Sequence, residues 1–233
     1  MNNPPINTPR HGTCEGDNDL AAVNHPLRSK TTRTKAEHDH KILPMKTQYY
    51  TAMSLDGFIA TEDDSLEWLF ALGDQSSSSY PAFIADVGAL VMGSATYEWI
   101  IRNAEKVVQE TGSPWPYTQP AWVFTSRVLP TVEGANIRFS NGNVRQAHTE
   151  MRSAAGAKNI WILGGGDLAG QFYDAGLLDE LIVQIGSVTL GRGKPLFPRR
   201  ALSPDLQLVS IHQMGASMAE LRYEVRKRKF HES

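Results

Sequence analysis

The stretch from Asn159 to Ser187, NIWILGGGDLAGQFYDAGLLDELIVQIGS, predicts a strand, a glycine turn, a helix and a second strand. The apolar runs 160–163 and 181–185 have the length of buried strands. Glycines between a buried strand and a helix let the backbone approach a ligand closely, and the free amides of the helix N-terminus face an anion. The motif therefore indicates a phosphate-binding turn. The alternative is a tight turn that only packs the helix on the strand.

The glycine motif differs from that of a Rossmann domain. Gly164, Gly166 and Ala169 fit the three small positions of the dinucleotide fingerprint loosely. The acid that a Rossmann domain carries about 20 residues further on is missing, because that region holds Gln184. The motif also lies far along the chain instead of at the first strand-to-helix turn. These two departures argue against a Rossmann domain.

Length and composition indicate a globular protein. The chain has 233 residues, of which 41% are hydrophobic and 21% charged, enough for one large domain or one domain with a tail. A formal charge of −2 gives no general attraction to nucleic acid or to anionic membranes, so we predict neither partner. The single cysteine, Cys14, excludes an intrachain disulfide and fits a cytoplasmic location. No apolar stretch approaches the roughly 18 residues that span a bilayer.

Residues 1–44 contain little apolar material, so we expect a disordered N-terminal extension before a domain over residues 45–227. The extension lacks the apolar core of a secretory signal. Met45 stands directly before the first strand-like run and is an alternative start. His38 and His40 could bind a metal ion, but we prefer to interpret them as part of a solvated tail, and we predict no metal site.

The rest of the chain alternates strands with helices. We expect strands at 48–54, 89–92, 121–124 and 136–139, and helices at 65–72, from Pro81, beyond Gly93 (with Val107 and Val108 inward) and from Asn143. The chain ends in an antiparallel hairpin, 206–211 with 221–225, around the turn 215–217. This order predicts a three-layer α/β domain with a mixed, mostly parallel central sheet and an antiparallel edge.

Three polar or glycine-rich loops follow predicted parallel strands, at 93–96, 125–127 and 164–168. The carboxyl ends of parallel strands lie at one edge of the sheet, where ligands of open α/β sheets bind. Two helix starts and the guanidinium of Arg127 would suit a ligand with several phosphates.

Five short motifs occur in chain order: MSLDGFIA (53–60), VMGSATYE (91–98), FTSR (124–127), ILGGGDL (162–168) and LGRGKPLF (190–197). In this order they resemble the dihydrofolate reductase-like superfamily, and more closely its branch containing the riboflavin-biosynthesis reductase C-terminal domain. The resemblance runs from about Met45 to Val225. It implies a stand-alone reductase of dihydrofolate reductase-like fold that uses NADPH and forms a homodimer.

The resemblance also assigns the cofactor contacts along the carboxyl edge of the sheet. By that likeness the phosphates lie on Gly93, Ser94 and Thr96, the adenosine end meets Thr125, Ser126 and Arg127, and the pyrophosphate binds at Gly164, Gly165, Gly166, Asp167 and Leu168. Arg127 beside two hydroxyls suits the 2′-phosphate, so NADPH should be preferred over NADH. The alternative is a surface arginine that caps a strand end.

The substrate implied by the resemblance is a small pyrimidine- or pterin-like heterocycle, as for a 5-amino-6-ribosylaminouracil reductase. Asp56 is the candidate acid or substrate-orienting carboxylate, with an ordinary Asp-Gly turn as the alternative. Trp68 could stack on the heterocycle, whereas Glu67 matches no family motif, which argues against pterin or folate reduction. The alternative function is a non-catalytic NADPH-binding or interaction protein of the same fold.

Overall fold

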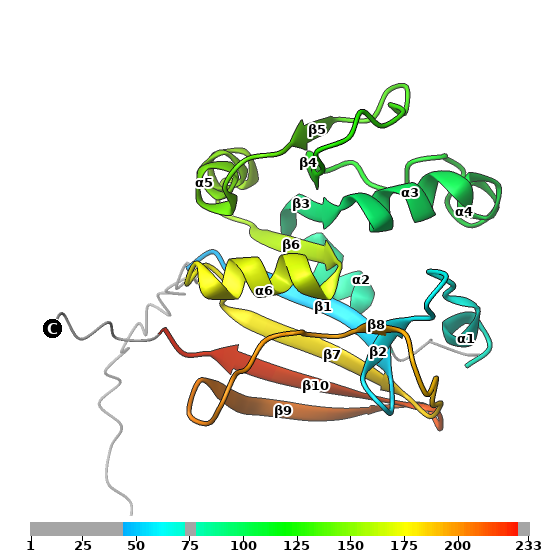
Figure 1. Ribbon diagram of the computed structural model, residues 1–233, viewed down its shortest axis with the longest axis vertical. Helices are drawn as coiled ribbons and strands as arrows, with labels where there is room; N and C mark the ends of the chain where they lie inside the picture. The colour runs from blue at the N-terminus through cyan, green and yellow to red at the C-terminus, as the bar shows by residue number, and fades with distance from the viewer. Residues whose placement is uncertain (1–43, 73–77, 228–233) are drawn as a thin grey trace, which may run out of the picture. The chain divides into compact units, whose positions relative to one another are not determined.

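The computed structural model describes residues 44–72 and 78–227 (Figure 1). Apart from Pro44, the extension predicted for residues 1–44 lies outside this part of the chain, and the predicted domain boundaries stay a prediction. None of the helices in the described ranges combines the length and the apolar character that crossing a membrane requires.

An eight-stranded sheet in the order β5-β4-β3-β6-β1-β7-β10-β9 forms the centre of the fold (Figure 1). The first six strands in this order pair in parallel, and β10 and β9 continue the sheet antiparallel. The strands are β1 (Thr47–Ser54), β3 (Val87–Gly93), β4 (Ala121–Phe124), β5 (Ile137–Ser140), β6 (Asn159–Gly164), β7 (Glu180–Gly186), β9 (Leu206–Met214) and β10 (Met218–Val225). This topology confirms the predicted mixed, mostly parallel sheet with an antiparallel edge.

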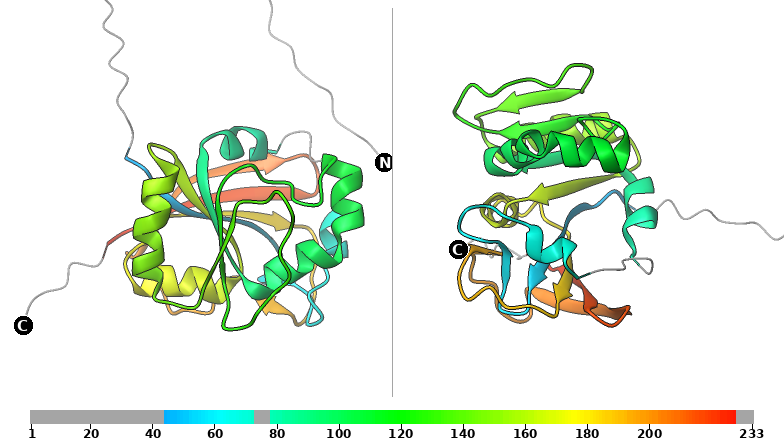
Figure 2. Two further views of the ribbon diagram at one scale, coloured as in Figure 1. Left: turned by 90° about the horizontal axis from the view of Figure 1, so that it is seen from above. Right: turned by 90° about the vertical axis from the view of Figure 1, so that its right-hand side faces the viewer.

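Helices pack on both faces of this sheet, which gives the predicted three layers (Figure 2). They are α1 (Glu67–Phe70), α2 (Tyr80–Ala85), α3 (Ser94–Arg102), α4 (Ala104–Thr111), α5 (Val144–Ala155) and α6 (Gly166–Asp174). Successive residues of β1 point to opposite faces, so Tyr49 joins the core under α5 and α6 while Tyr50 joins the core under α2 and α3.

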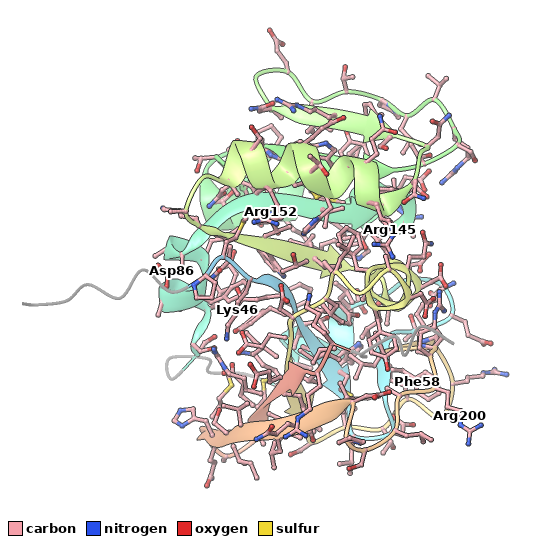
Figure 3. All side chains as sticks on the ribbon, turned by 90° about the vertical axis from the view of Figure 1, so that its left-hand side faces the viewer. Lys46, Phe58, Asp86, Arg145, Arg152 and Arg200 are labelled. Carbon is pink, nitrogen blue, oxygen red and sulfur yellow. The ribbon has the colours of Figure 1, made fainter. Side chains whose placement is uncertain are left out.

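Helix α5 follows its sequence pattern closely. The side chain of Asn143 caps it by accepting a hydrogen bond from the amide of Arg145 at 2.8 Å. Its four predicted inward residues are all buried: Val144, Ala147, Met151 and Ala155. Its charged residues, Arg145 and Arg152 among them, are exposed on the outer side (Figure 3). Helical spacing of apolar residues is therefore sufficient to place this helix.

The long helix predicted beyond Gly93 is interrupted at Asn103 and forms α3 and α4. The Asn103 side-chain amide donates to the Trp99 carbonyl at 2.8 Å, a local bond of the kind by which asparagine competes with helix geometry. As a result Val107 is buried, but Val108, predicted to face inward, is 42% exposed. Helix α1 is likewise shorter than predicted, and its Phe70 is exposed while it stacks on Trp99.

A separate two-stranded antiparallel pair lies beside the carboxyl edge of β1. It consists of β2 (Phe58–Ala60) and β8 (Lys194–Pro195), with Ala60 opposite Lys194. The pair is close-packed, because a Cβ on Gly193 would collide with the carbonyl oxygen of Ala60. The MSLDGFIA and LGRGKPLF motifs, which are far apart in sequence, therefore meet at this point.

Candidate functional site

A cavity of about 320 Å³ opens at the carboxyl ends of β3 and β6. Its walls come from the β3–α3 turn, the β6–α6 turn, β1 and the β2–β8 pair. Six of the predicted cofactor-binding residues line it: Gly93, Thr96, Gly164, Gly165, Gly166 and Asp167. The structure thus brings together two of the three loops that the sequence singled out.

The three glycines of the β6–α6 turn differ in what surrounds them. A Cβ on Gly164 would lie 2.8 Å from the Thr96 hydroxyl, and one on Gly166 would collide with the carbonyl oxygens of Pro195 and Leu196. A Cβ on Gly165 would meet no atom within 4 Å. Gly164 and Gly166 therefore serve close packing, whereas Gly165 leaves free space at the cavity wall. The packing interpretation therefore holds for Gly164 and Gly166, and phosphate binding at Gly165 stays a prediction.

Two helix N-termini converge on this space. Helices α3 and α6 each have nine residues, and their N-caps, Gly93 and Gly165, have no side chain that could bond the first-turn amides. A Cβ on Gly93 would lie 4.0 Å from the Gly165 nitrogen, so the two caps face each other. Free first-turn amides and the positive ends of two helix dipoles favour an anion, and the open side of Gly165 gives it room. The arrangement fits the pyrophosphate of a dinucleotide.

Two residues of the same loops contribute differently from the prediction. The side chain of Leu168 is only 5% exposed and belongs to the core under α5 and α6, so Leu168 can offer a ligand its backbone amide alone. Ser94 begins α3 but is not among the residues that line the cavity.

The loop after β4 presents Arg127 in an ion pair. Its guanidinium donates to both carboxylate oxygens of Glu98 on α3, at 3.0 and 2.7 Å, and its backbone amide donates to Thr125 Oγ1 at 3.0 Å. This bond holds the pKa of Glu98 below its ordinary value. Thr125, Ser126 and Arg127 do not line the cavity. Their adenosine contacts stay a prediction, in which a 2′-phosphate would compete with Glu98.

Asp56 joins two loops. Its carboxylate accepts hydrogen bonds from the Ser54 hydroxyl at 2.6 Å, the Leu190 amide at 3.0 Å and the Gly191 amide at 2.7 Å. The bond from Ser54, followed by those from the two amides, lowers the pKa of Asp56 below its ordinary value. The group is therefore ionised at neutral pH, and it is not part of the cavity lining. Its catalytic role stays a prediction, and its contacts favour the alternative of a loop-fixing turn residue.

The aromatic wall of the cavity is Trp99 and not the predicted Trp68. The Trp68 ring lies against Gly186 at the end of β7, where a Cβ would be 3.2 Å from it, and Trp68 does not line the cavity. Trp99 of α3 does, together with Leu66 and Leu163. The sequence carried a signal for Trp99, because it stands four residues after Ala95 and three after Thr96, on the same helix face.

Charged side chains beside the cavity are paired with one another. Lys194 Nζ lies 3.6 Å from an Asp64 oxygen, and both residues line the cavity. Arg199 bonds Asp167 at 3.0 Å and Asp174 at 2.7 Å. Sequence patterns did not indicate these pairs, since they join segments up to 130 residues apart.

A second cavity, of about 410 Å³, lies at the amino ends of the strands, where Lys46 and Asp86 are found (Figure 3). Its buried carboxylate, Glu180, is bonded by Gln48 at 2.5 Å and paired with Lys46 at 3.4 Å. Within residues 44–72 and 78–227, no three His, Cys, Asp or Glu side chains are grouped so as to hold a metal ion. Ligands of open α/β sheets bind at the carboxyl edge, which makes the first cavity the candidate site.

Most of the chain matches known proteins. The family model of the RibD C-terminal domain matches residues 46–219. The uncharacterized protein YwjB of Bacillus subtilis (strain 168) is 32% identical over 179 residues, which cover 76% of this chain and 97% of YwjB.

Solved structures share the fold. A putative riboflavin biosynthesis protein from Shewanella sp. PV-4 has a TM-score of 0.62 and 24% identity, covering 78% of this chain and 99% of its own. Dihydrofolate reductase from Enterococcus faecalis, in complex with NADP(H), has a TM-score of 0.51 and 17% identity, covering 78% of this chain and 97% of its own. These structures confirm the dihydrofolate reductase-like fold. The match to the family model shows that the chain belongs to the RibD C-terminal domain family.

Proposed function

We propose that this chain is an NADPH-dependent reductase that acts on a small planar heterocycle of the pyrimidine or pterin type. The observation that carries the proposal is the meeting of two uncapped helix N-termini beside the open side of Gly165. Family membership supports a reductase, and the dihydrofolate reductase of similar fold is itself a complex with NADP(H).

The cavity lining combines polar and apolar groups. The first-turn amides of α3 and α6 would hold the pyrophosphate, and the Thr96 hydroxyl would add a donor. The side chains of Ile59, Leu66, Trp99 and Leu163 would keep water away from the reacting rings. NADPH supplies the hydride when it is bound. The protein supplies orientation and a dry site.

Steady-state oxidation of NADPH in the presence of pterins, pyrimidines and quinones tests the proposal. We expect turnover with at least one planar heterocycle. NADPH binding without turnover across all three classes would instead support the non-catalytic cofactor-binding protein. Failure to bind NADPH at all would refute both.

We further propose that the protein acts as a homodimer through its exposed edge strand. β9 is the last strand of the sheet, and Leu208, Val209 and Ile211 on it are 46%, 55% and 67% exposed. Apolar edge strands invite pairing with a second chain. Light scattering should give the mass of a dimer at tens of micromolar protein. The double variant Val209→Lys, Ile211→Lys should give the mass of a monomer.

A further inference from the structure

The side chain of Arg199 lies along helix α6 and bonds an acid near each of its ends. Its Nε donates to Asp174, the last residue of the helix, at 2.7 Å, and its Nη1 donates to Asp167 in the first turn at 3.0 Å. Gly170 stands between the two acids, and a Cβ there would lie 2.7 Å from Arg199 Cζ. Because Gly170 has no side chain, the arginine can lie flat on the helix. The side chain of Arg199 is therefore only 24% exposed.

The segment that carries Arg199 is fixed against the first turn of the same helix. A Cβ on Gly166 would collide with the carbonyl oxygens of Pro195 and Leu196. The amide of Leu196 donates to the carbonyl of Gly57 at 2.9 Å, which ties the segment to the loop after β1. Arg199 thus reaches α6 from a backbone that is packed on both sides.

Asp167 places a negative charge beside the first-turn amides of α6. It is the second residue of the helix and lines the cavity together with Gly165 and Gly166. A bond from Gln171 at 2.9 Å lowers the pKa of Asp167, Arg199 acts in the same direction, and burial opposes both. The carboxylate is therefore ionised at neutral pH.

This carboxylate and an anionic ligand would compete for the same positive end of the helix. A negative side chain in the first turn interacts with the partial charge that also attracts an anion, and the two negative charges repel each other. Gln171 is neutral and cannot offset the repulsion. The guanidinium of Arg199 can, because it brings a full positive charge to within 3.0 Å of the Asp167 carboxylate.

We propose that Arg199 is a positioning residue for the cofactor, which neutralises Asp167 and so lets the pyrophosphate bind at the first turn of α6. Arg199 does not line the cavity, so it acts through Asp167. Asp174 has no part in this effect, because seven residues of helix, about 10 Å, separate it from Asp167. The inference rests on the proposed binding of NADPH and deepens it.

Variants of the full chain, titrated with NADPH by fluorescence, separate the charge effect from a structural one. Arg199→Gln leaves the charge of Asp167 unopposed and should raise the dissociation constant by about fivefold at low ionic strength. Adding Asp167→Asn should restore the wild-type value. Adding Asp174→Asn instead is the matched control, because it restores the same net charge, and it should leave the loss in place. At about 1 M salt the screening length is about 3 Å, and the ratio of variant to wild type should approach one.

Asp167→Asn alone gives a second test that does not depend on the folding of Arg199→Gln. It removes a negative charge beside the amides and keeps Arg199, so it should tighten NADPH binding several-fold at low salt. Weaker binding in this variant would overturn the inference.

Inorganic pyrophosphate, titrated by calorimetry against the same proteins, distinguishes this inference from the proposed function. If NADPH does not bind but pyrophosphate binds with the expected pattern, the proposed function fails and the role of Arg199 stands. If NADPH binds and Arg199→Gln has no effect, or its loss is not relieved by Asp167→Asn, or Asp174→Asn relieves it equally, the inference fails and the proposed function stands. Failure of both ligands to bind the wild type would overturn both.

Discussion

The turn after β6 and the loop after β4 both belong to the predicted cofactor site, yet they meet a ligand in opposite ways. The turn offers backbone amides and the empty side of Gly165, so an anion can bind without displacing a protein group. The loop offers Arg127, whose two terminal guanidinium nitrogens, Nη1 and Nη2, already donate hydrogen bonds to the Glu98 carboxylate. We propose that the fold itself provides the pyrophosphate cradle. Discrimination between NADPH and NADH would, in contrast, depend on how easily Glu98 releases Arg127.

The largest expected effect separates the glycines of the β6–α6 turn. Gly166→Ala forces a Cβ onto the carbonyl oxygens of Pro195 and Leu196, and should lower the free energy of unfolding by about 1–3 kcal/mol. Gly165 has an extended backbone with φ −92°, and a Cβ there would meet no atom within 4 Å. The stability of Gly165→Ala should therefore stay close to that of the wild type. Urea denaturation of the two variants measures the difference. Equal losses would show that Gly165 is also a packing glycine.

The next effect concerns cofactor choice at the β4 loop. Arg127→Ala removes a charge-assisted contact and should weaken NADPH binding by about one to two orders of magnitude, with NADH almost unchanged. Glu98→Gln frees the guanidinium and should tighten NADPH binding several-fold. Fluorescence titration with both cofactors gives these values. Parallel changes for NADPH and NADH would show that Arg127 does not read the 2′-phosphate.

Asp56→Asn should lower turnover less than the loss of a proton donor would. Asp56→Asn loses one of the two oxygens that hold the Leu190 and Gly191 amides, and we expect turnover to fall by roughly tenfold through the displaced loop. Because the pKa of Asp56 is lowered, the group stays ionised between pH 5 and pH 8, and the pH profile of kcat should keep its shape in the variant. Loss of one limb of that profile in the variant would identify Asp56 as the acid.

The smallest effect lies away from both loops, at His148 of α5. Burial, followed by the nearby Arg152, lowers its pKa below 6.5; Lys227 acts in the same direction and Asp179 opposes it. A histidine with a lowered pKa binds its proton more tightly in the unfolded chain, so stability is complete above pH 6.5 and falls as the pH drops below it. His148→Gln can keep a bond to Thr47 Oγ1, 2.9 Å from the ring, and should flatten this decline. Unfolding free energies measured from pH 7 to pH 5 test this, and an unchanged slope would contradict it.

The sequence predicted the elements whose cause is local. The spacing of Val144, Ala147, Met151 and Ala155 is enough to place α5, and apolar runs before glycines are enough to place β3 and β6. Parallel pairing places the carboxyl ends of β3 and β6 at one edge of the sheet. The proximity of Gly93 and Gly165 could therefore be predicted from the sequence.

What the sequence missed depends on which segments become neighbours. Glu98 reaches Arg127 because β3 lies next to β4, and Asp64 reaches Lys194 because β2 pairs with β8. No local sequence pattern indicates that either pair of strands will be neighbours. Trp68 and Trp99 are both aromatic residues on short helices, and only the packing of α1 on α3 decides which one faces the cavity. Helix α4 separates from α3 through one side-chain bond of Asn103.

The central claim is that a ligand anion occupies the free space at Gly165. NADPH titration of Gly165→Ala, monitored by tryptophan fluorescence, tests it most directly. A methyl group placed in that space should raise the dissociation constant by at least about tenfold, while the unfolding midpoint of the free protein stays that of the wild type. An unchanged dissociation constant in a folded Gly165→Ala variant would contradict the account, because the cofactor would then lie elsewhere.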